Sequence, residues 1–352
     1  MAPLDNPSIP KGSIVLVTGA SGLIASNIVD QFLHYGYKVR GTVRDPKKSA
    51  WLAKLFDEKY GKENFELVAV PEMMAEGAFD EAVKGVSAVI HTASPMTFDS
   101  NPHNVIPVAI AGAVNALKAT YTEPGVKRFV FTSSSTSVVI SKRDTPGIVV
   151  TEETWNEDSI KQAWADPPYG PERSSPVYAA SKTQAEQEVW KFHKENQQKR
   201  PDLVVNTVLP NTNFGKSLNP IEQGYPSTSG MPVALWKGDE AQLRGLGTLA
   251  PQYFVNVQDS ARLHVAAALF ADVKDERIFA FAGRFSWDTI LDIFRKAEPN
   301  RKFADNFSSG DDPNEIQPRA RAEQLLRELG EPGWVSLEQT ILELVEQLRA
   351  SE

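Results

Sequence analysis

A tyrosine and a lysine, Tyr178 and Lys182, stand four positions apart in a segment whose residues favour a helix. Pro176 precedes them where a proline suits the first helical turn, and the intervening alanines are strong helix formers. Residues at positions i and i+4 share a helix face, so the phenol and the ammonium should lie side by side. A neighbouring cation lowers the pKa of a phenol, which would make Tyr178 a general acid and base near neutral pH. The alternative is a surface helix that carries a half-buried tyrosine and a solvated lysine.

An apolar, β-branched run from Ile14 to Val17 leads into a glycine-rich turn near the N-terminus. The turn consists of Thr18-Gly19-Ala20-Ser21-Gly22-Leu23-Ile24-Ala25, and apolar residues at helical spacing follow it as far as Gly36. Gly19 permits a tight turn, Gly22 lets the backbone approach a pyrophosphate, and the helix N-terminus supplies N–H donors and a positive dipole end. The alternative is a purely structural turn. The sequence favours a dinucleotide site whose phosphate contacts are Thr18, Gly19, Ser21, Gly22, Leu23 and Ile24.

The segment after a second predicted strand, Tyr37 to Val43, distinguishes NAD from NADP. An NAD enzyme usually places an acidic residue there to hold the ribose hydroxyls. This chain has Arg44, and either Lys47 or Lys48 can add a second contact; such cations suit a 2′-phosphate. Asp45 is acidic, but it precedes a proline and is typical of the start of a turn. The segment therefore favours NADPH.

Four further apolar runs are typical of buried parallel strands: Phe65 to Val70, Val86 to His91, Lys127 to Phe131 and Leu203 to Leu209. Ligands of open α/β sheets bind beyond the carboxyl ends of the strands, so the residues after each run should border the cofactor. We therefore expect Thr92, Ala93 and Ser94 beside the cofactor. Glu72 and Met73 follow another run, and they either border an adenine ring or form an ordinary loop.

A cluster of hydroxyl side chains, Thr132 to Ser137, follows the run that ends at Phe131. We expect one of these hydroxyls to donate a hydrogen bond to a substrate carbonyl. The alternative is a polar loop that satisfies its own backbone.

Composition restricts the class of protein. The chain has 352 residues, 41% hydrophobic and 23% charged, as is usual for globular proteins, and its net charge of −8 argues against nucleic-acid or membrane-surface binding. It has no cysteine, which excludes disulfides and thiolate metal sites, and its five histidines lack metal-ligand spacing, so we expect no metal. No run approaches the ~20 apolar residues that span a bilayer, and the N-terminal segment does not have the pattern of a signal peptide. We expect a cytoplasmic protein.

These elements predict an α/β fold, a doubly wound parallel sheet of the Rossmann type with a smaller, mostly helical substrate-binding lobe. Residues 1–210 should form the NADP-binding domain. Residues 253–285 should return to it, with Tyr253 to Val257 as a strand of the main sheet. Residues 211–252, where regular alternation is lost, should form the lobe together with residues 286–352.

The glycine-rich turn, the hydroxyl cluster and the stretch Tyr178-Ala179-Ala180-Ser181-Lys182 together resemble the extended short-chain dehydrogenase/reductases. The closer similarity is to the branch of dihydroflavonol reductases and of yeast and fungal NADPH-dependent carbonyl reductases of the aldehyde reductase II type. The similarity covers nearly the whole chain. Four further stretches carry it, in the same order as in that branch: Val39-Arg40-Gly41-Thr42-Val43-Arg44-Asp45, Glu76-Gly77-Ala78-Phe79-Asp80, Lys127-Arg128-Phe129-Val130-Phe131-Thr132-Ser133-Ser134 and Trp334-Val335-Ser336-Leu337-Glu338.

The resemblance implies a Ser-Tyr-Lys catalytic set and NADPH/NADP+ as the cofactor. Its serine corresponds to Ser134, with the adjacent Ser133 as the alternative. Tyr178 would give its proton to the carbonyl oxygen, and Lys182 would lower the pKa of that tyrosine and hold the nicotinamide ribose. Ser134 would polarise the carbonyl. The implied cofactor contacts are Arg44 and Lys48 at the 2′-phosphate, Glu72 and Met73 at the adenine, and Thr92, Ala93, Ser94, Pro210, Asn211 and Asn213 toward the nicotinamide.

Departures from the family pattern bear on the substrate. Plant dihydroflavonol reductases carry an asparagine that grips the flavonoid where this chain has Val139, so a flavonoid hydroxyl would lose a partner. The resemblance implies an apolar wall that suits aryl ketones, ketoesters and hydrophobic aldehydes, although each wall residue could equally be core. We expect a small-molecule carbonyl substrate and a monomer or homodimer. The expected wall residues are Thr97, Phe98, Phe214, Trp236, Leu249 and Gln252.

Two other functions fit the same fold. One is a nucleotide-sugar epimerase or dehydratase, which usually prefers NAD; Arg44 argues against it. The other is a regulator that senses NADPH without turnover, and such a protein has no need of Ser134, Tyr178 and Lys182.

Overall fold

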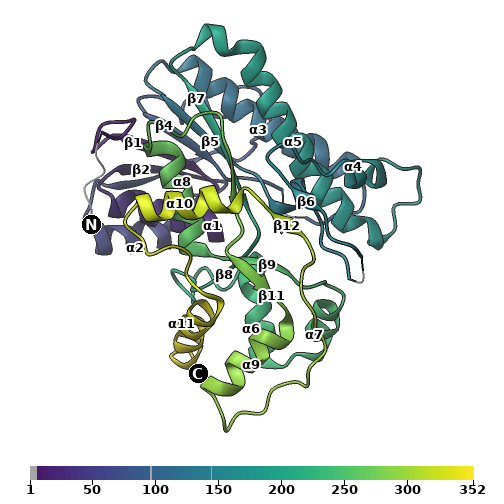
Figure 1. The fold of residues 1–352 in the computed structure, drawn as a ribbon. Coiled ribbons are helices and arrows are strands. Elements are labelled where there is room, and N and C mark those ends of the chain that lie inside the picture. The colour runs from purple at the N-terminus through teal and green to yellow at the C-terminus, as the bar shows by residue number, and fades with distance from the viewer. Residues whose placement is uncertain (1–5, 96, 144) are drawn as a thin grey trace.

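The computed structural model describes residues 6–95, 97–143 and 145–352, and residues 1–5 of the N-terminal segment considered above lie outside it. A parallel sheet forms the centre of this part of the chain (Figure 1). Its seven strands have the order β10-β7-β5-β4-β1-β2-β3, so the chain proceeds in opposite directions from the point between β1 and β4. The predicted doubly wound α/β fold is confirmed. The strands are β1 (Ile14–Thr18), β2 (Lys38–Val43), β3 (Phe65–Ala69), β4 (Ala88–His91), β5 (Arg128–Thr132), β7 (Val204–Pro210) and β10 (Arg277–Ala280).

The two largest clusters of the core lie on opposite faces of this sheet. Successive side chains of a strand point to opposite faces, so in β1 Val15 and Val17 enter one core and Leu16 enters the other. In β5, Phe129 and Val130 divide in the same way. A strand buried on both faces needs apolar residues at nearly every position, which is why these runs could be recognised in the sequence.

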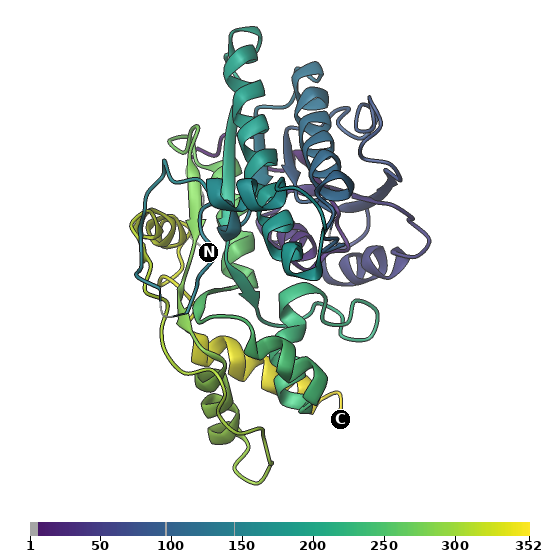
Figure 2. The same cartoon turned by 90° about the vertical axis from the view of Figure 1, so that its right-hand side faces the viewer.

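Helices cover both faces (Figures 1 and 2). One face carries α3 (Pro102–Thr122) and α5 (Ser174–Asn196), and α4 (Glu157–Ala163) packs against α5. The other carries α1 (Leu23–His34), α2 (Ala50–Tyr60), α8 (Val257–Leu269) and α10 (Arg319–Glu328).

Helix α3 differs from one expectation. Among the described helices it is long and apolar enough to cross a membrane by length and composition, whereas we expected no segment near that length. Its apolar residues, including Ala113 and Leu117, pack against the sheet and against α5. This packing is that of a core helix in a globular protein.

A second sheet organises the smaller lobe. It consists of β8 (Thr212–Phe214), β9 (Gln252–Asn256) and β11 (Gly283–Phe285) in the order β11-β9-β8 within the described residues. The prediction that Tyr253–Val257 rejoins the main sheet is therefore wrong, because β9 pairs with β8 and β11. A buried apolar run looks the same whichever sheet it joins. The elements that do return to the main sheet are α8, which packs on it, and β10, which pairs with β7.

The remaining elements complete the lobe and its connections. Helix α10 packs against α8 and β10, so part of the predicted lobe segment 286–352 lies on the main sheet. The other helices are α6 (Gly230–Lys237), α7 (Glu240–Gly247), α9 (Trp287–Ala297) and α11 (Leu337–Arg349). The short elements are β6 (Val149–Val150), β12 (Glu315–Ile316), η1 (Ser135–Ser137), η2 (Pro171–Arg173), η3 (Gln197–Lys199) and η4 (Ser227–Ser229).

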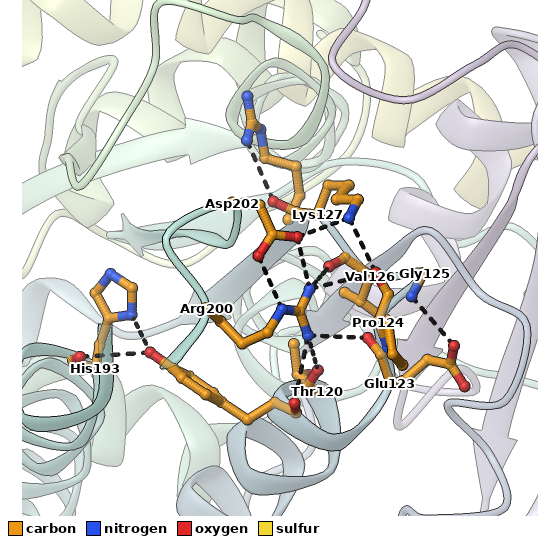
Figure 3. A network of polar contacts seen from close by, with 11 residues as sticks. Thr120, Glu123, Pro124, Gly125, Val126, Lys127, His193, Arg200 and Asp202 are labelled. Atoms are coloured by element: carbon orange, nitrogen blue, oxygen red, sulfur yellow. Dashed lines mark hydrogen bonds and ion pairs between the residues drawn. The ribbon is translucent and has the colours of Figure 1, made fainter. Parts of the chain in front are cut away.

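Arg200 and Asp202 organise the edge of the sheet at which β5 and β7 begin (Figure 3). The Arg200 guanidinium donates to backbone carbonyls at the end of α3, including that of Thr120, and its Nε lies 2.9 Å from Asp202 Oδ1. The Lys127 ammonium lies 2.6 Å from Asp202 Oδ2. Hydrogen bonds from these cations hold the pKa of Asp202 below its usual value.

Candidate active site

The residues that the sequence singled out gather where four strands of the main sheet end. Gly19 follows β1, Thr92 follows β4, Ser133 follows β5 and Asn211 follows β7. Because the strands are parallel, these carboxyl ends share one edge of the sheet, opposite to the edge that Arg200 organises. This edge includes the point between β1 and β4 where the strand order reverses, which is the usual ligand position in such sheets.

Tyr178 and Lys182 lie one turn apart on α5, as their spacing predicts. Tyr178 is half-buried, and the ring of Phe98 lies against it with centroids 5.2 Å apart. Lys182 is only 5% exposed. Burial lowers the pKa of Lys182 to about 8, while the carboxylate of Glu186, one further turn along, acts to raise it.

The pKa of Tyr178 lies above its ordinary value, so the predicted lowering by Lys182 is wrong for this structure. Burial disfavours the phenolate, and it outweighs a hydrogen bond with Ser134, which acts to lower the pKa. A phenol with a raised pKa stays protonated at neutral pH. Tyr178 is therefore in the form that can give up a proton.

The two adjacent serines differ in what their hydroxyls contact. Ser134 Oγ accepts hydrogen bonds from the backbone N and the Oγ1 of Thr136, at 3.2 and 3.0 Å, so its own proton is free to be donated. Its side chain is close enough to Tyr178 to act on the pKa of the phenol. Ser133 instead donates to Glu186 Oε2 at 2.6 Å. Ser134 is thus the serine beside the tyrosine. The Ser133 hydroxyl instead uses its proton in a hydrogen bond to the buried carboxylate of Glu186.

This difference leads to a prediction for the two serines. We expect Ser134→Ala to lower kcat by about 100-fold, as is usual when one donor to a developing oxyanion is lost. Ser133→Ala should lower kcat less than about tenfold, because it removes only a neutral donor to a positioned carboxylate. Steady-state kinetics of both variants against one carbonyl substrate would measure the contrast. The reverse order would move the catalytic role to Ser133.

The glycine-rich turn is fixed against the end of β4. Gly19 has φ +68°, and a Cβ there would lie 3.2 Å from Ala93 Cα, so both the conformation and the space require glycine. Thr18 Oγ1 accepts hydrogen bonds from the backbone N–H groups of Thr92 and Ala93, at 2.9 and 3.0 Å. Its own proton is therefore left for His91 Nδ1, 3.1 Å away.

The N-terminus of α1 follows this turn and has properties that suit a phosphate. Gly22 is the N-cap residue, no side chain caps the helix, and its first turn contains no acidic residue. The first backbone N–H groups and the positive end of the helix dipole can therefore face an anion. The side chain of Gln223, from the lobe, lies at the turn, with its Nε2 2.8 Å from Ser26 Oγ and 3.2 Å from the Ser21 carbonyl oxygen.

Two buried histidines near this site, His91 and His264, make the stability of the fold depend on pH. Burial is the main cause that lowers the pKa of His91 to about 3 and that of His264 to about 4. A histidine in the unfolded chain has a pKa near 6.5. Just below that pH, the unfolded state therefore binds protons that the folded state does not bind. The stabilisation is present above about pH 6.5 and is lost as the pH falls toward the folded values, by up to about 1.4 kcal/mol per pH unit for each histidine.

We therefore expect His264→Gln to reduce the acid dependence of the unfolding free energy by about 1.4 kcal/mol per pH unit between about pH 6 and 4.5. Glutamine can still bond Thr132, whose Oγ1 lies 2.9 Å from His264 Nε2. Urea unfolding over this pH range measures the slope, and the exposed His34→Gln serves as control. Asp259, whose pKa burial raises to about 6, acts in the opposite sense in every variant, so the difference between variants isolates the histidine. An unaltered slope would contradict the prediction.

Arg44 and Lys48 lie just beyond the end of β2, exposed and without an ion-pair partner among the described residues. Arg40, on β2 itself, is held by other parts of the protein: its Nε lies 2.6 Å from Glu66 Oε1, and its Nη1 donates to the Ala82 and Lys84 carbonyls. Arg40 therefore has a structural role, whereas the Arg44 side chain is available to a ligand. The free cations lie where a 2′-phosphate would be held in a dinucleotide fold.

Glu72 and Met73 form the turn after β3, where the sequence allowed either an adenine border or an ordinary loop. Glu72 is exposed, and Met73 is half-buried and packs over Gly112 of α3. Asn115 of α3 lies beneath the turn, and its Nδ2 is 3.0–3.2 Å from the carbonyl oxygens of residues 73–75. Asn115 therefore holds the loop in place.

Unpartnered polar atoms mark the other half of the site. Thr92 Oγ1 and Asn213 Oδ1 are buried and have no hydrogen-bond partner in the described part of the chain. Asn211, after Pro210, accepts a hydrogen bond at its Oδ1 from the backbone N of the next residue and, at its carbonyl, from Asn213 Nδ2. Buried polar atoms are nearly always paired, so these two fit a ligand that itself carries polar groups. Ala93 and Ser94 follow Thr92 in the loop after β4. The residues present therefore fit a nicotinamide dinucleotide.

The expected substrate wall separates into two groups. Thr97 and Phe98 are exposed, and Leu249 and Gln252 are half-buried. Phe214 and Trp236 are core residues of the lobe, which corrects their interpretation as wall residues. The Phe214 side chain has no exposed surface and packs 4.9 Å from the ring of Phe285. The Trp236 side chain is 3% exposed, between Phe294 and the guanidinium of Arg301.

Comparison with known proteins gives the family. The model of the NAD dependent epimerase/dehydratase family matches residues 15–280. The chain belongs to this family. Aldehyde reductase 2 of Sporidiobolus salmonicolor is 42% identical over 346 residues, which cover 98% of each chain. Ketoreductase adrE of Penicillium rubens is 39% identical over 344 residues, or 96% of this chain and 97% of the relative.

A solved structure agrees with these sequence relatives. Gre2 from Candida albicans in complex with NADPH superposes with a TM-score of 0.82 at 27% identity, covering 97% of this chain and 100% of that one. The resemblance to extended short-chain dehydrogenase/reductases is confirmed. Within the epimerase/dehydratase family, the reductases among these relatives identify the chain as an oxidoreductase.

Two residues at this epimerase/dehydratase-type site were missed in the sequence. Glu186 continues the four-residue spacing of Tyr178 and Lys182, and that spacing was the available signal. Gln223 lies in an irregular segment with no periodic pattern, and only the fold brings it to Ser21. Both side chains form hydrogen bonds with residues of other segments: Glu186 with Ser133, and Gln223 with Ser21 and Ser26.

Proposed function

We propose that the protein is an NADPH-dependent carbonyl reductase that converts ketones or aldehydes to alcohols. The observation that carries the proposal is the meeting of Ser134 and Tyr178 hydroxyls, with the Lys182 ammonium one turn away, at the edge of the sheet that holds the glycine-rich turn. Proton donor, hydrogen-bond donor and cation all converge where one oxygen atom of a substrate could lie.

The proposed roles follow from the state of each side chain. NADPH supplies the hydride to the carbonyl carbon when it is bound. Tyr178, whose phenol is protonated at neutral pH, gives its phenolic proton to the carbonyl oxygen. Ser134 donates its free proton as a hydrogen bond to the same oxygen and stabilises the charge that develops there. The Lys182 ammonium, one turn from Tyr178 on α5, would bind ribose hydroxyls of the cofactor.

The choice of NADPH rests on Arg44 and Lys48, exposed cations without partners in the described chain at the end of β2. A guanidinium can bind a phosphate with two parallel hydrogen bonds, and a lysine can add a point charge. The complex of Gre2 with NADPH supports the same choice, because that protein has the same fold. The glycine-rich turn, Thr92 and Asn213 would hold the rest of the cofactor.

The substrate class rests on the relatives and on the wall. The Sporidiobolus and Penicillium proteins are named as an aldehyde reductase and a ketoreductase. Phe98, whose ring lies against that of Tyr178, presents an exposed aromatic surface to whatever approaches the phenol. Val139, at the position of the flavonoid-binding asparagine, is apolar and packs against a core cluster. We therefore propose aryl ketones, ketoesters and hydrophobic aldehydes as substrates.

NADPH oxidation, followed by absorbance with a panel of these carbonyl compounds, tests the proposal. We expect turnover of at least one aryl ketone, ketoester or aldehyde. NADPH binding, measured separately by fluorescence, together with no turnover of any carbonyl would favour a cofactor-sensing regulator. Conversion of a nucleotide sugar with bound NAD would favour an epimerase or dehydratase. Either result would overturn the reductase proposal.

A further inference from the structure

Glu186 is a fully buried carboxylate on the same face of α5 as Tyr178 and Lys182. Its Oε2 accepts hydrogen bonds from Ser133 at 2.6 Å and from Ser137 at 3.0 Å. Its Oε1 lies 3.0 Å from Thr207 Oγ1 of β7. Both carboxylate oxygens are therefore occupied by donors from other elements, and the side chain does not point at the reaction site itself.

The two serines that Glu186 binds flank Ser134. Ser133 immediately precedes it. The Ser137 hydroxyl, in η1, has one proton, which it shares between Glu186 Oε2 and the Ser134 carbonyl oxygen, 2.7 Å away. The turn Ser133–Ser137 is thus held at both ends by a residue of α5. Since Ser134 lies inside that turn and Tyr178 lies on α5, Glu186 connects the two segments that carry the serine hydroxyl and the phenol.

Arg277 of β10 is the counter-ion. Its Nε lies 2.7 Å from Glu186 Oε1, and the side chain is only 8% exposed. The guanidinium stacks 3.8 Å from the centroid of the Trp155 ring and donates to the carbonyls of Glu152 and Thr154. Burying such a pair costs desolvation, and well-packed apolar residues are often as stable, so stability alone does not explain it.

We propose that Glu186 is a positioning residue for carbonyl reduction: it holds the Ser134 turn against α5 and places a negative charge one turn from Lys182. The inference rests on the proposed reductase function and adds to it a residue that touches neither substrate nor cofactor. Arg277 of β10 holds the Glu186 carboxylate in place through their ion pair.

The groups around Lys182 decide the second part of the proposal. Tyr178 lies one turn before it and Glu186 one turn after it on α5. His91 of β4 is close enough for the ammonium to affect it, and is neutral; Arg277 lies beyond Glu186. Glu186 is thus the negative charge that acts on Lys182 against burial. Without it, Lys182 should lose its proton at a lower pH.

Glu186→Gln tests the proposal, with Asp202→Asn as a matched control. Both replace a carboxylate that pairs with arginine by an amide, but Asp202 lies at the opposite edge of the sheet. We expect Glu186→Gln to lower kcat at least about tenfold with little change in KM, and to move the alkaline limb of the kcat profile about one pH unit lower. Hydrogen exchange of the ligand-free protein should become faster in residues 133–137. Asp202→Asn should change none of these.

Glu186→Asp separates the two parts and provides a second route if the glutamine variant does not fold. The aspartate keeps the charge, so the alkaline limb should stay, but its shorter side chain cannot reach Ser133, so kcat should fall. Wild-type kcat in either folded variant, or an unmoved alkaline limb in Glu186→Gln, would leave Glu186 a structural residue only. Absence of carbonyl turnover in the wild type would instead refute the proposed function, and the exchange measurement would still test the turn.

Discussion

Tyr178→Phe is expected to lower kcat by about 10³-fold and to leave the dissociation constant of NADPH within about twofold. The substitution removes one oxygen atom, which is the atom that would give its proton to the substrate. The ring remains, so its packing against Phe98 and its place on α5 should be kept. Single-turnover kinetics and fluorescence titration with NADPH would measure the two quantities on the same preparation.

Tyr121→Phe is the matched control for this prediction. Tyr121 is also partly buried, and its hydroxyl lies 2.8 Å from His193 Nδ1, but it belongs to the last turn of α3 near the opposite edge of the sheet. Its loss should lower the melting temperature and leave kcat unchanged. If Tyr178→Phe lost NADPH binding, or kept more than about a tenth of wild-type kcat, Tyr178 would not be the general acid.

The main sheet and the glycine-rich turn could be predicted because their signals are local. The central strands β1, β4 and β5 are buried at nearly every position and are therefore largely apolar along their length. Gly19 is required by its own φ of +68° and by the approach of Ala93, and the sequence marks such a position by the residue type alone. The spacing of Tyr178 and Lys182 predicted their shared face for the same reason, since a helix repeats every 3.6 residues.

The lobe could not be predicted in the same way. Its sheet joins β8, β9 and β11, and two of these strands are only three residues long, too short for a periodic pattern. Aromatic residues add a second ambiguity, because Phe214 and Trp236 could form a substrate wall or a core, and the choice depends on Phe285 and Phe294, which come much later in the chain.

Electrostatic predictions failed where tertiary burial decides. The neighbour of Tyr178 was correctly predicted to be a cation, yet burial raises the pKa of the phenol and lowers that of Lys182. The residue that opposes this burial is Glu186, whose partner Arg277 is 91 positions away. A helix pattern places Glu186 on the right face, but only the fold supplies the arginine and the serines that explain it.

Arg44→Asp is expected to reverse the cofactor preference, with the ratio of kcat/KM for NADPH over NADH falling by about 100-fold or more. Each hydrogen bond from a guanidinium to an ionised group contributes about 1.5–3 kcal/mol, or roughly 10- to 150-fold, and the new carboxylate would also repel a phosphate. The same carboxylate can accept hydrogen bonds from the ribose hydroxyls of NADH, which is the arrangement usual in NAD enzymes. Kinetics with both cofactors on one carbonyl substrate give the ratio directly.

Arg40→Gln provides the control, because Arg40 lies on the same strand and is bound to Glu66 and to two backbone carbonyls. Its loss should lower stability without altering the cofactor ratio, since its guanidinium is already bound to Glu66 and to two backbone carbonyls. The salt dependence gives a second test: the NADPH advantage of the wild type should shrink at high ionic strength, because Arg44 and Lys48 are exposed and their charges are screened. An unchanged ratio in Arg44→Asp would mean that the 2′-phosphate is bound elsewhere, with Lys48 or Lys47 as the next residues to substitute.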